Sequence, residues 1–152
     1  GGDRFRRAVS KVLTDKAPGL PQEVGERVKR LRCAFVSQFD TRGMALLEAT
    51  RGFIARTCMP SESGRTCRIM WDFAWRFREQ LRKGDALYLE SQDVIYLLIW
   101  SALVLNSDAH SPNVKCKMKM SEWVHNTKLA IDAARAKSTQ APPWAPPPPA
   151  SR

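Results

Sequence analysis

Residues 91–119 read SQDVIYLLIWSALVLNSDAHSPNVKCKMK and join the most apolar segment of the chain to an abrupt polar one. From residue 94 to residue 105 only one serine is plainly polar. A membrane span needs roughly 20 apolar residues, and this shorter run is flanked by Asp93 and Asp108. The pattern therefore favours a buried central helix with almost no solvated face, started by Ser91 or Asp93 as a cap, over a bilayer-spanning helix.

The polar segment that follows, residues 106–113, is dense in side chains that hydrogen-bond to nearby backbone. Asn106, Asp108 and His110 are also residue types of metal or acid–base sites. Each of them has a structural use as a helix terminus or a turn former. We therefore expect an ordered polar loop, with or without a binding role, and keep metal or acid–base chemistry as the alternative.

Length and charge bound the remaining possibilities. A chain of 152 residues with 43% hydrophobic content can bury one sizeable core. The net charge of +10 is uneven: residues 1–33 hold nine Lys and Arg against four acids, 34–110 hold nine against nine, and 111–152 hold seven against two. Basic ends of this kind favour anionic partners, whether lipid headgroups, nucleic acid or an acidic protein surface.

The four cysteines show no C-x-x-C pairing, and only two histidines are present to complete a zinc site. Cys58 and Cys67 fall in segments with helical spacing, where a free cysteine usually acts as a small hydrophobe. We expect a reduced, cytosolic setting and no structural metal. Residues 1–30 lack the apolar core of a signal peptide.

Apolar residues recur at helical spacing along most of the remaining chain. Helices are predicted over residues 4–16, from Pro21 to about Phe39, over 44–58, through 69–81, and from Ser121 to about residue 137. The expected buried lines are Met44, Leu47, Ile54 and Cys58 in the third helix and Ile69, Phe73, Phe77 and Leu81 in the fourth. Trp71 and Trp75 are expected to pack against a neighbouring helix.

The sequence ends in APPWAPPPPASR, which lacks the backbone donors for a helix or sheet and predicts an extended tail or linker. The predicted division is a helical domain over residues 1–137 and a Pro-rich disordered tail over 138–152. No strand alternation, repeat, phosphate loop or nucleophile motif is evident. The residues alone therefore predict an all-α domain without an obvious active site.

Two short motifs nevertheless occur in order. MPSES, residues 59–63, precedes one helix, and LNSDAHSPNV, residues 105–114, ends the apolar one. They resemble the Leu-Pro-Gly-Glu-Ala-Gln and Leu-Asn-Thr-Asp-Leu-His-Asn-Pro signatures of the Sec-seven domain family, exchange modules that act on Arf-type small GTPases. The resemblance covers roughly residues 28–127 and includes LLEATRGFI at 46–54. Ser61 and Gly64 depart from the family's Gly and Gln.

The resemblance implies a single-domain, right-handed array of about five to seven helices that uses no cofactor and forms no covalent bond with its substrate. The implied catalytic residue is Glu62, whose carboxylate would oppose the β-phosphate and Mg²⁺ in the nucleotide site of the GTPase. The implied partner-binding residues are Tyr96, Val104, Asn106 and Asp108, and the loop-shaping residues are Pro60, Ser61, His110 and Pro112.

The implied partner is an Arf-family small GTPase in its GDP-bound and nucleotide-free forms. The basic ends favour an anionic membrane surface as well, so the expected location is the cytoplasm with transient association with Golgi, endosomal or plasma membranes. Two alternatives stay open. One is a helical interaction module of the same family without exchange activity, and the other is a basic nucleic-acid-binding domain, for which no recognised motif is present.

Overall fold

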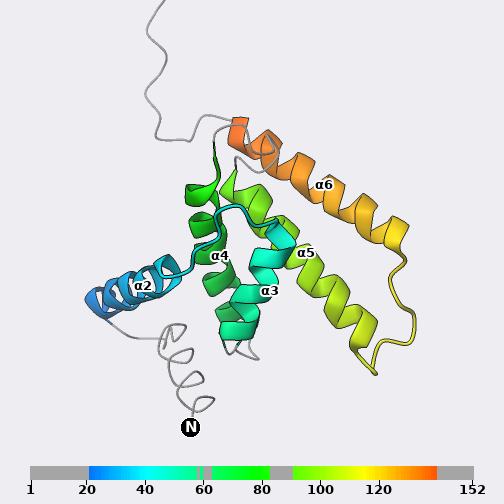
Figure 1. The fold of residues 1–152 in the computed structure, drawn as a ribbon. Coiled ribbons are helices and arrows are strands. Elements are labelled where there is room, and N and C mark those ends of the chain that lie inside the picture. The colour runs from blue at the N-terminus through cyan, green and yellow to red at the C-terminus, as the bar shows by residue number, and fades with distance from the viewer. Residues whose placement is uncertain (1–20, 58, 60–62, 83–90, 140–152) are drawn as a thin grey trace, which may run out of the picture.

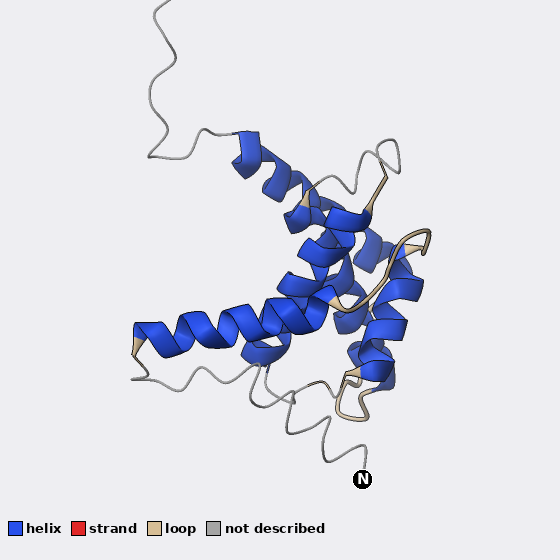
Figure 2. Ribbon diagram, turned by 60° about the vertical axis from the view of Figure 1, so that its left-hand side comes forward, coloured by secondary structure: helices blue, strands red, loops and turns tan. Residues whose placement is uncertain are grey.

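A computed structural model describes residues 21–57, 59, 63–82 and 91–139, and in these ranges the chain is built from helices without a strand (Figures 1 and 2). The all-α prediction is confirmed. The helices are α2 (Gln22–Ser37), α3 (Leu46–Arg56), α4 (Ser63–Gln80), α5 (Gln92–His110) and α6 (Met120–Thr139). The helix predicted over residues 4–16, the loop at 60–62 and the Pro-rich tail from residue 140 lie outside the described residues.

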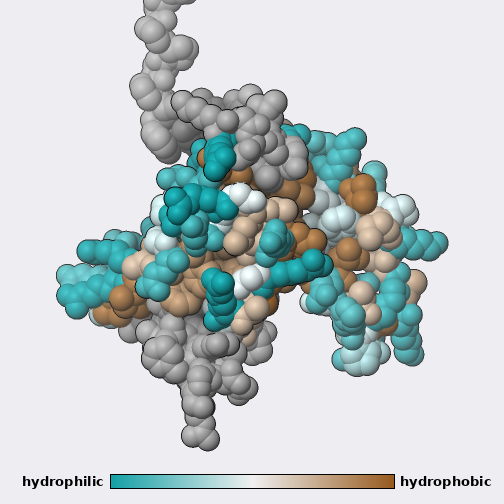
Figure 3. Space-filling model, in the orientation of Figure 1, coloured by the Kyte–Doolittle hydropathy of each residue, from teal (hydrophilic) through white to brown (hydrophobic). Residues whose placement is uncertain are grey.

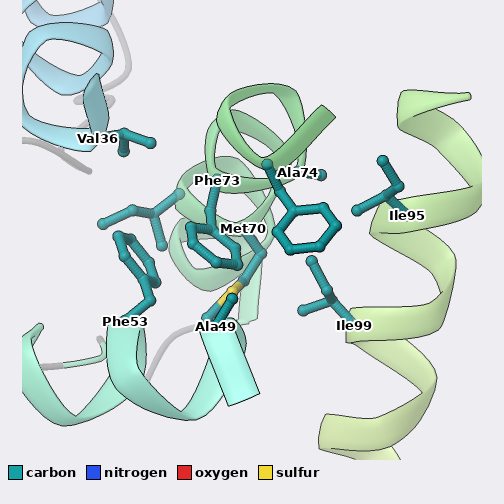
Figure 4. Packing of buried hydrophobic residues seen from close by; sticks show 10 residues of the cluster. Val36, Ala49, Phe53, Met70, Phe73, Ala74, Ile95 and Ile99 are labelled. Atoms are coloured by element: carbon teal, nitrogen blue, oxygen red, sulfur yellow. The ribbon is translucent and has the colours of Figure 1, made fainter. Parts of the chain in front are cut away.

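Helix α4 lies at the centre of the core. Of its predicted buried line, Ile69, Phe73 and Phe77 are buried, and Leu81, just past the end of the helix, is partly buried against the core. Helices α2, α3 and α5 pack around α4 (Figure 4). Phe53 of α3 stacks on Phe73 with ring centroids 4.4 Å apart. From α5 the core receives Ile95 and Ile99. The core is therefore organised by α4, although the sequence had pointed to the later, more apolar helix.

Helix α2 is attached mainly to α4. Val36 is its fully buried residue, and one turn earlier Arg32 donates from Nε to the carboxylate of Asp72 in an ion pair with little exposure to solvent. The segment after α2 is fixed to the other end of α4, because the backbone N–H and hydroxyl of Thr41 both donate to Gln80 Oε1. A turn at Arg42 and Gly43 separates α2 from α3 and uses Gly43 at φ 74°, a conformation that favours glycine.

Helix α5 differs from its prediction in length and burial. It continues to His110, so the first five residues of the expected polar loop are helical. The first strong helix breaker after this apolar segment is Pro112. A proline disfavours helical geometry for the residue before it, and Ser111 is extended. The helix also has an open side, since Val104 is 40% exposed. Ser91 occupies the N-cap position, but its hydroxyl makes no capping hydrogen bond.

The predicted buried line of α3 was wrong in its first half: Ile54 packs against the core as predicted and Cys58 lies outside the described residues, but Met44 and Leu47 are not buried. Met44 and Leu47 are 43% and 49% exposed, whereas Ala49, Thr50 and Phe53 are buried. The burial follows Phe53, the largest side chain of the helix, and Thr50 satisfies its buried hydroxyl by donating to the Leu46 carbonyl at 2.7 Å. Because Thr50 is polar, the spacing of apolar residues does not mark this face of α3 as the buried one.

Helix α6 packs along α5 and lies at the outer edge of the molecule (Figure 1). The indole N–H of Trp123 donates to the Ser101 carbonyl of α5 at 2.9 Å, and Glu122 accepts from the Lys119 backbone N–H at the start of the helix. Figure 3 shows apolar patches among polar ones where α5 and α6 lie. None of the described helices is long and apolar enough to cross a bilayer.

Candidate functional site

A groove of about 650 Å³ lies beside the second half of α5. We call it the α5 groove. Its walls come from the end of α3, the start of α4, the exposed side of α5 and the loop after α5. The residues that line it are Ile54, Met59, Ser63, Thr66, Trp100, Leu103, Val104, Ser107, Asp108, Ser111 and Val114. The lining is mostly apolar and includes several hydroxyl groups and the carboxylate of Asp108, which suits a protein or ligand surface of mixed polarity.

The predicted partner-binding residues divide between the groove and its surroundings. Val104 and Asp108 line the groove. Tyr96 lies one helical turn before Trp100 and stacks on it at a centroid distance of 6.4 Å, so it supports a wall of the groove from outside. Asn106 is exposed on α5 and is not among the lining residues. The tertiary structure thus brings three of the four to the groove or its edge.

Tyr96 is held between α4 and α5. Its ring meets Trp71 edge to face at 5.3 Å, as expected for a tryptophan packed on a neighbouring helix. Burial, and then a hydrogen bond with Cys67 of α4, raises the pKa of Tyr96 to about 12. The phenol is therefore neutral at physiological pH and acts as a rigid aromatic support.

The predicted loop-shaping residues of the second motif lie where α5 ends. His110 is the last residue of the helix and is exposed, and Pro112 is exposed in the turn that follows. Asp108 has a direct structural role here, because its Oδ2 accepts the backbone N–H of Met118 at 2.8 Å. This bond folds the loop back against the end of α5 and so sets one wall of the groove.

Residues of the first motif also line the groove. Pro60, Ser61 and Glu62 lie outside the described residues, so their predicted roles stay predictions. Met59 and Ser63, which flank these three residues in the chain, both line the α5 groove. The two motifs, more than 40 residues apart in sequence, therefore flank one groove.

Sequence reasoning missed Trp100, Leu103 and Thr66 as groove residues. A signal existed on α5, because Tyr96, Trp100 and Leu103 recur at intervals of four and three, the spacing of one helix face. The signal was hidden because the residues between them are equally apolar. No comparable pattern marked Thr66, which reaches the groove through the packing of α4 on α5.

A second cleft, of about 570 Å³, lies between the start of α3, the end of α4, α5 and Trp123 of α6. Leu47 on its rim accounts for part of the exposed apolar surface of α3. Among the predicted site residues that the structure describes, none lines this cleft. Across the described ranges, no cluster of three or more His, Cys, Asp or Glu side chains has the arrangement of a metal site.

Comparison with known proteins identifies the family. A model of the Sec7 domain matches residues 6–139. The chain therefore belongs to the Sec7 domain family, as the two motifs indicated. The solved Sec7p catalytic domain has the same fold, with a TM-score of 0.63 and 26% identity over 86% of this chain and 68% of that one.

Curated relatives carry names that describe exchange activity. The Saccharomyces cerevisiae protein "ADP-ribosylation factor guanine nucleotide-exchange factor SEC7" is 35% identical over 67% of this chain, and Arabidopsis thaliana "ARF guanine-nucleotide exchange factor GNL2" is 32% identical over 86% of it. The matched parts make up 5% and 9% of those proteins. A further structure with the same fold, 22% identical with a TM-score of 0.62, is titled "Structure of ARF1-GDP bound to Sec7 domain complexed with Brefeldin A".

Proposed function

We propose that this chain is a guanine-nucleotide exchange module that promotes GDP release and GTP loading on an Arf-type small GTPase. Membership of the Sec7 domain family and the names of the relatives support this proposal. The observation that carries it is the α5 groove, because both signature motifs of the family flank it. A mostly apolar groove that also offers hydroxyl and carboxylate groups is suited to receive a mobile segment of a partner protein.

In the proposed mechanism, the groove holds the GTPase while Glu62 acts on the nucleotide. A carboxylate about 4 Å from another unit negative charge is repelled by about 4 kcal/mol at an effective dielectric near 20. Repulsion of this size weakens the binding of the β-phosphate and its Mg²⁺. The exchange factor then acts by binding the nucleotide-free GTPase better than the loaded one, which requires no covalent step.

The decisive experiment measures release of a fluorescent GDP analogue from a panel of Arf-type GTPases. Glu62→Lys replaces repulsion of the β-phosphate by attraction, and each 1.4 kcal/mol is about tenfold in rate, so losses of several decades are expected. Glu48→Lys is the matched control: it makes the same charge change at an exposed position of α3 that does not line the groove, and it should retain activity. Undiminished release by Glu62→Lys would refute the mechanism.

The same assay tests the alternative of an interaction module without exchange activity. The departures at Ser61 and Gly64 favour this alternative, because they change the residues on both sides of Glu62 in the family motif. Gly64 is the second residue of α4, close to the groove-lining Ser63. Stable binding of a GTPase without any acceleration of release would support the alternative over the exchange function.

A further inference from the structure

A lysine outside the α5 groove closes the loop that forms one of its walls. Lys117 donates from Nζ to the backbone carbonyl of Asp108 at 2.7 Å and to that of Ser111. The next residue, Met118, donates its backbone N–H to Asp108 Oδ2. We call these three hydrogen bonds the Lys117 clasp. They join the far end of the loop to the last turn of α5.

The position of the lysine follows from the end of the helix. The last carbonyls of a helix have no partner within it and carry the negative end of its dipole, which favours a cation there. Because Ser111 is extended and Pro112 has no N–H, the chain that continues from α5 offers few backbone donors at this point. The ammonium of Lys117 has three N–H donors; it supplies one to the Asp108 carbonyl in the last turn of α5 and one to the carbonyl of Ser111, the residue just past the helix.

The clasp fixes the position of residues that line the groove, although Lys117 itself does not line it. Ser107, Asp108, Ser111 and Val114 line the groove, and all four lie on the part of the chain that the clasp closes or directly beside it. Val114 is fixed further by its backbone N–H, which donates to the Ser111 carbonyl. Lys117 is exposed, so its loss removes few packing contacts. Its structural effect falls on the shape of the loop more than on the core.

We propose that Lys117 is a positioning residue of the exchange reaction: by tying the loop to the end of α5, it presets the wall against which the GTPase docks. The inference rests on the proposed function. A preformed wall spares the complex the cost of ordering the loop on binding. The effect of Lys117 should therefore appear in the apparent affinity for the GTPase, whereas the step attributed to Glu62 should proceed at its usual rate once the complex forms.

The test uses the full chain with Lys117→Met, which keeps the length of the side chain and removes its charge and donors. Initial rates of nucleotide release across a range of GTPase concentrations separate KM from kcat. We expect KM to rise at least about tenfold, because the loss of one charge-assisted hydrogen bond typically has that effect and the variant removes two, with kcat within about twofold of the parent. Lys117→Arg retains a cation with N–H donors and should recover most of the loss.

Lys115→Met is the matched control, because Lys115 is exposed in the same loop, carries the same charge and takes no part in the clasp. It should leave KM close to the parent value. An equal rise in KM for both variants would assign the effect to general charge and overturn the inference. So would a Lys117→Met variant with an unchanged KM, while the proposed exchange function would stand.

Hydrogen exchange provides a readout that needs no GTPase. Lys117→Met should increase exchange of the backbone N–H groups of Val114 and Met118, and the α4 core should keep its protection. If the parent chain binds and activates no GTPase, the proposed function fails and the role of Lys117 in exchange fails with it. If the parent is active and the loop of Lys117→Met is as protected as in the parent, the clasp does not set the loop and the inference alone is wrong.

Discussion

Replacement of Asp72 by asparagine should lower the free energy of unfolding of the domain and weaken the attachment of α2 to α4. Asp72 is 7% exposed and accepts from Arg32, whose side chain is equally shielded from solvent. Removing one charge of a buried pair takes away the attraction that offsets the desolvation of the other charge, and it typically costs about 3–5 kcal/mol. Domains of this size have total stabilities of about 5–15 kcal/mol, so the loss is a large fraction of the whole.

Equilibrium urea unfolding, followed by circular dichroism at 222 nm and by tryptophan fluorescence, measures the effect. With a urea dependence of about 2 kcal/mol per molar, the unfolding midpoint of Asp72→Asn should fall by about 2 M. Hydrogen exchange should show the loss of protection first in α2, because α2 packs mainly on α4. The paired variant Arg32→Met with Asp72→Leu removes both charges and should recover much of the lost stability.

The ion pair between Asp40 and Arg42 provides the matched control, because the side chains of both residues are exposed to solvent. Its geometry is good, and the Arg42 guanidinium holds the pKa of the Asp40 carboxyl well below its usual range. Because solvent screens exposed pairs, Asp40→Asn should leave the urea midpoint almost unchanged. The reasoning is refuted if Asp72→Asn unfolds at the same urea concentration as the parent, or if Asp40→Asn loses as much as Asp72→Asn.

Three further predictions concern the groove, the tyrosine and the basic surface. Val104→Asp should lower nucleotide release by about 5- to 150-fold, because burying an unpaired polar group against the GTPase costs about 1–3 kcal/mol. The change in stability should be small because Val104 is 40% exposed, and an unchanged rate would remove Val104 from the interface. The pKa of Tyr96 is raised to about 12, above the value of about 10 expected in the unfolded chain, so the neutral phenol stabilises the folded state. This contribution should be fully present below about pH 10 and should be lost as the pH rises toward 12. Absorbance at 295 nm with Tyr96→Phe as reference tests this, and a midpoint near 10 would contradict it. Flotation with phosphatidylserine-rich vesicles should exceed that with neutral ones and fall for Lys119→Glu with Lys128→Glu, and equal flotation with both lipids would exclude an anionic membrane surface as a partner.

Much of the fold was predictable because helix periodicity is local. The line of Ile69, Phe73 and Phe77 emerges from spacing alone, and the structure buries all three. The end of α5 is also encoded locally, at Pro112, but the polar residues before it favour a loop in a reading of the sequence alone. Helices tolerate polar residues on an exposed side, so polarity without a breaker does not end one.

The candidate site was predictable only in part. The motifs pointed to Val104 and Asp108, which line the α5 groove, but did not point to Trp100, Leu103 or Thr66. In a helix that is apolar on nearly every side, the spacing of the residues on the open side cannot be told apart from that of their equally apolar neighbours. That choice depends on where α4 and α6 cover α5, which is a matter of packing between segments distant in sequence.

The sequence by itself determined the class of the protein: an all-α chain of the Sec7 domain family, with two motifs in order and basic ends. These properties follow from local spacing, residue identity and charge, which need no partner elsewhere in the chain. The tertiary structure decided that α4 organises the core, that Arg32 finds Asp72 across 40 residues, and that Lys117 closes the wall of the groove. Each depends on side chains meeting in space after the helices pack, and packing is determined by the summed fit of all the helices rather than by the pattern of any one of them.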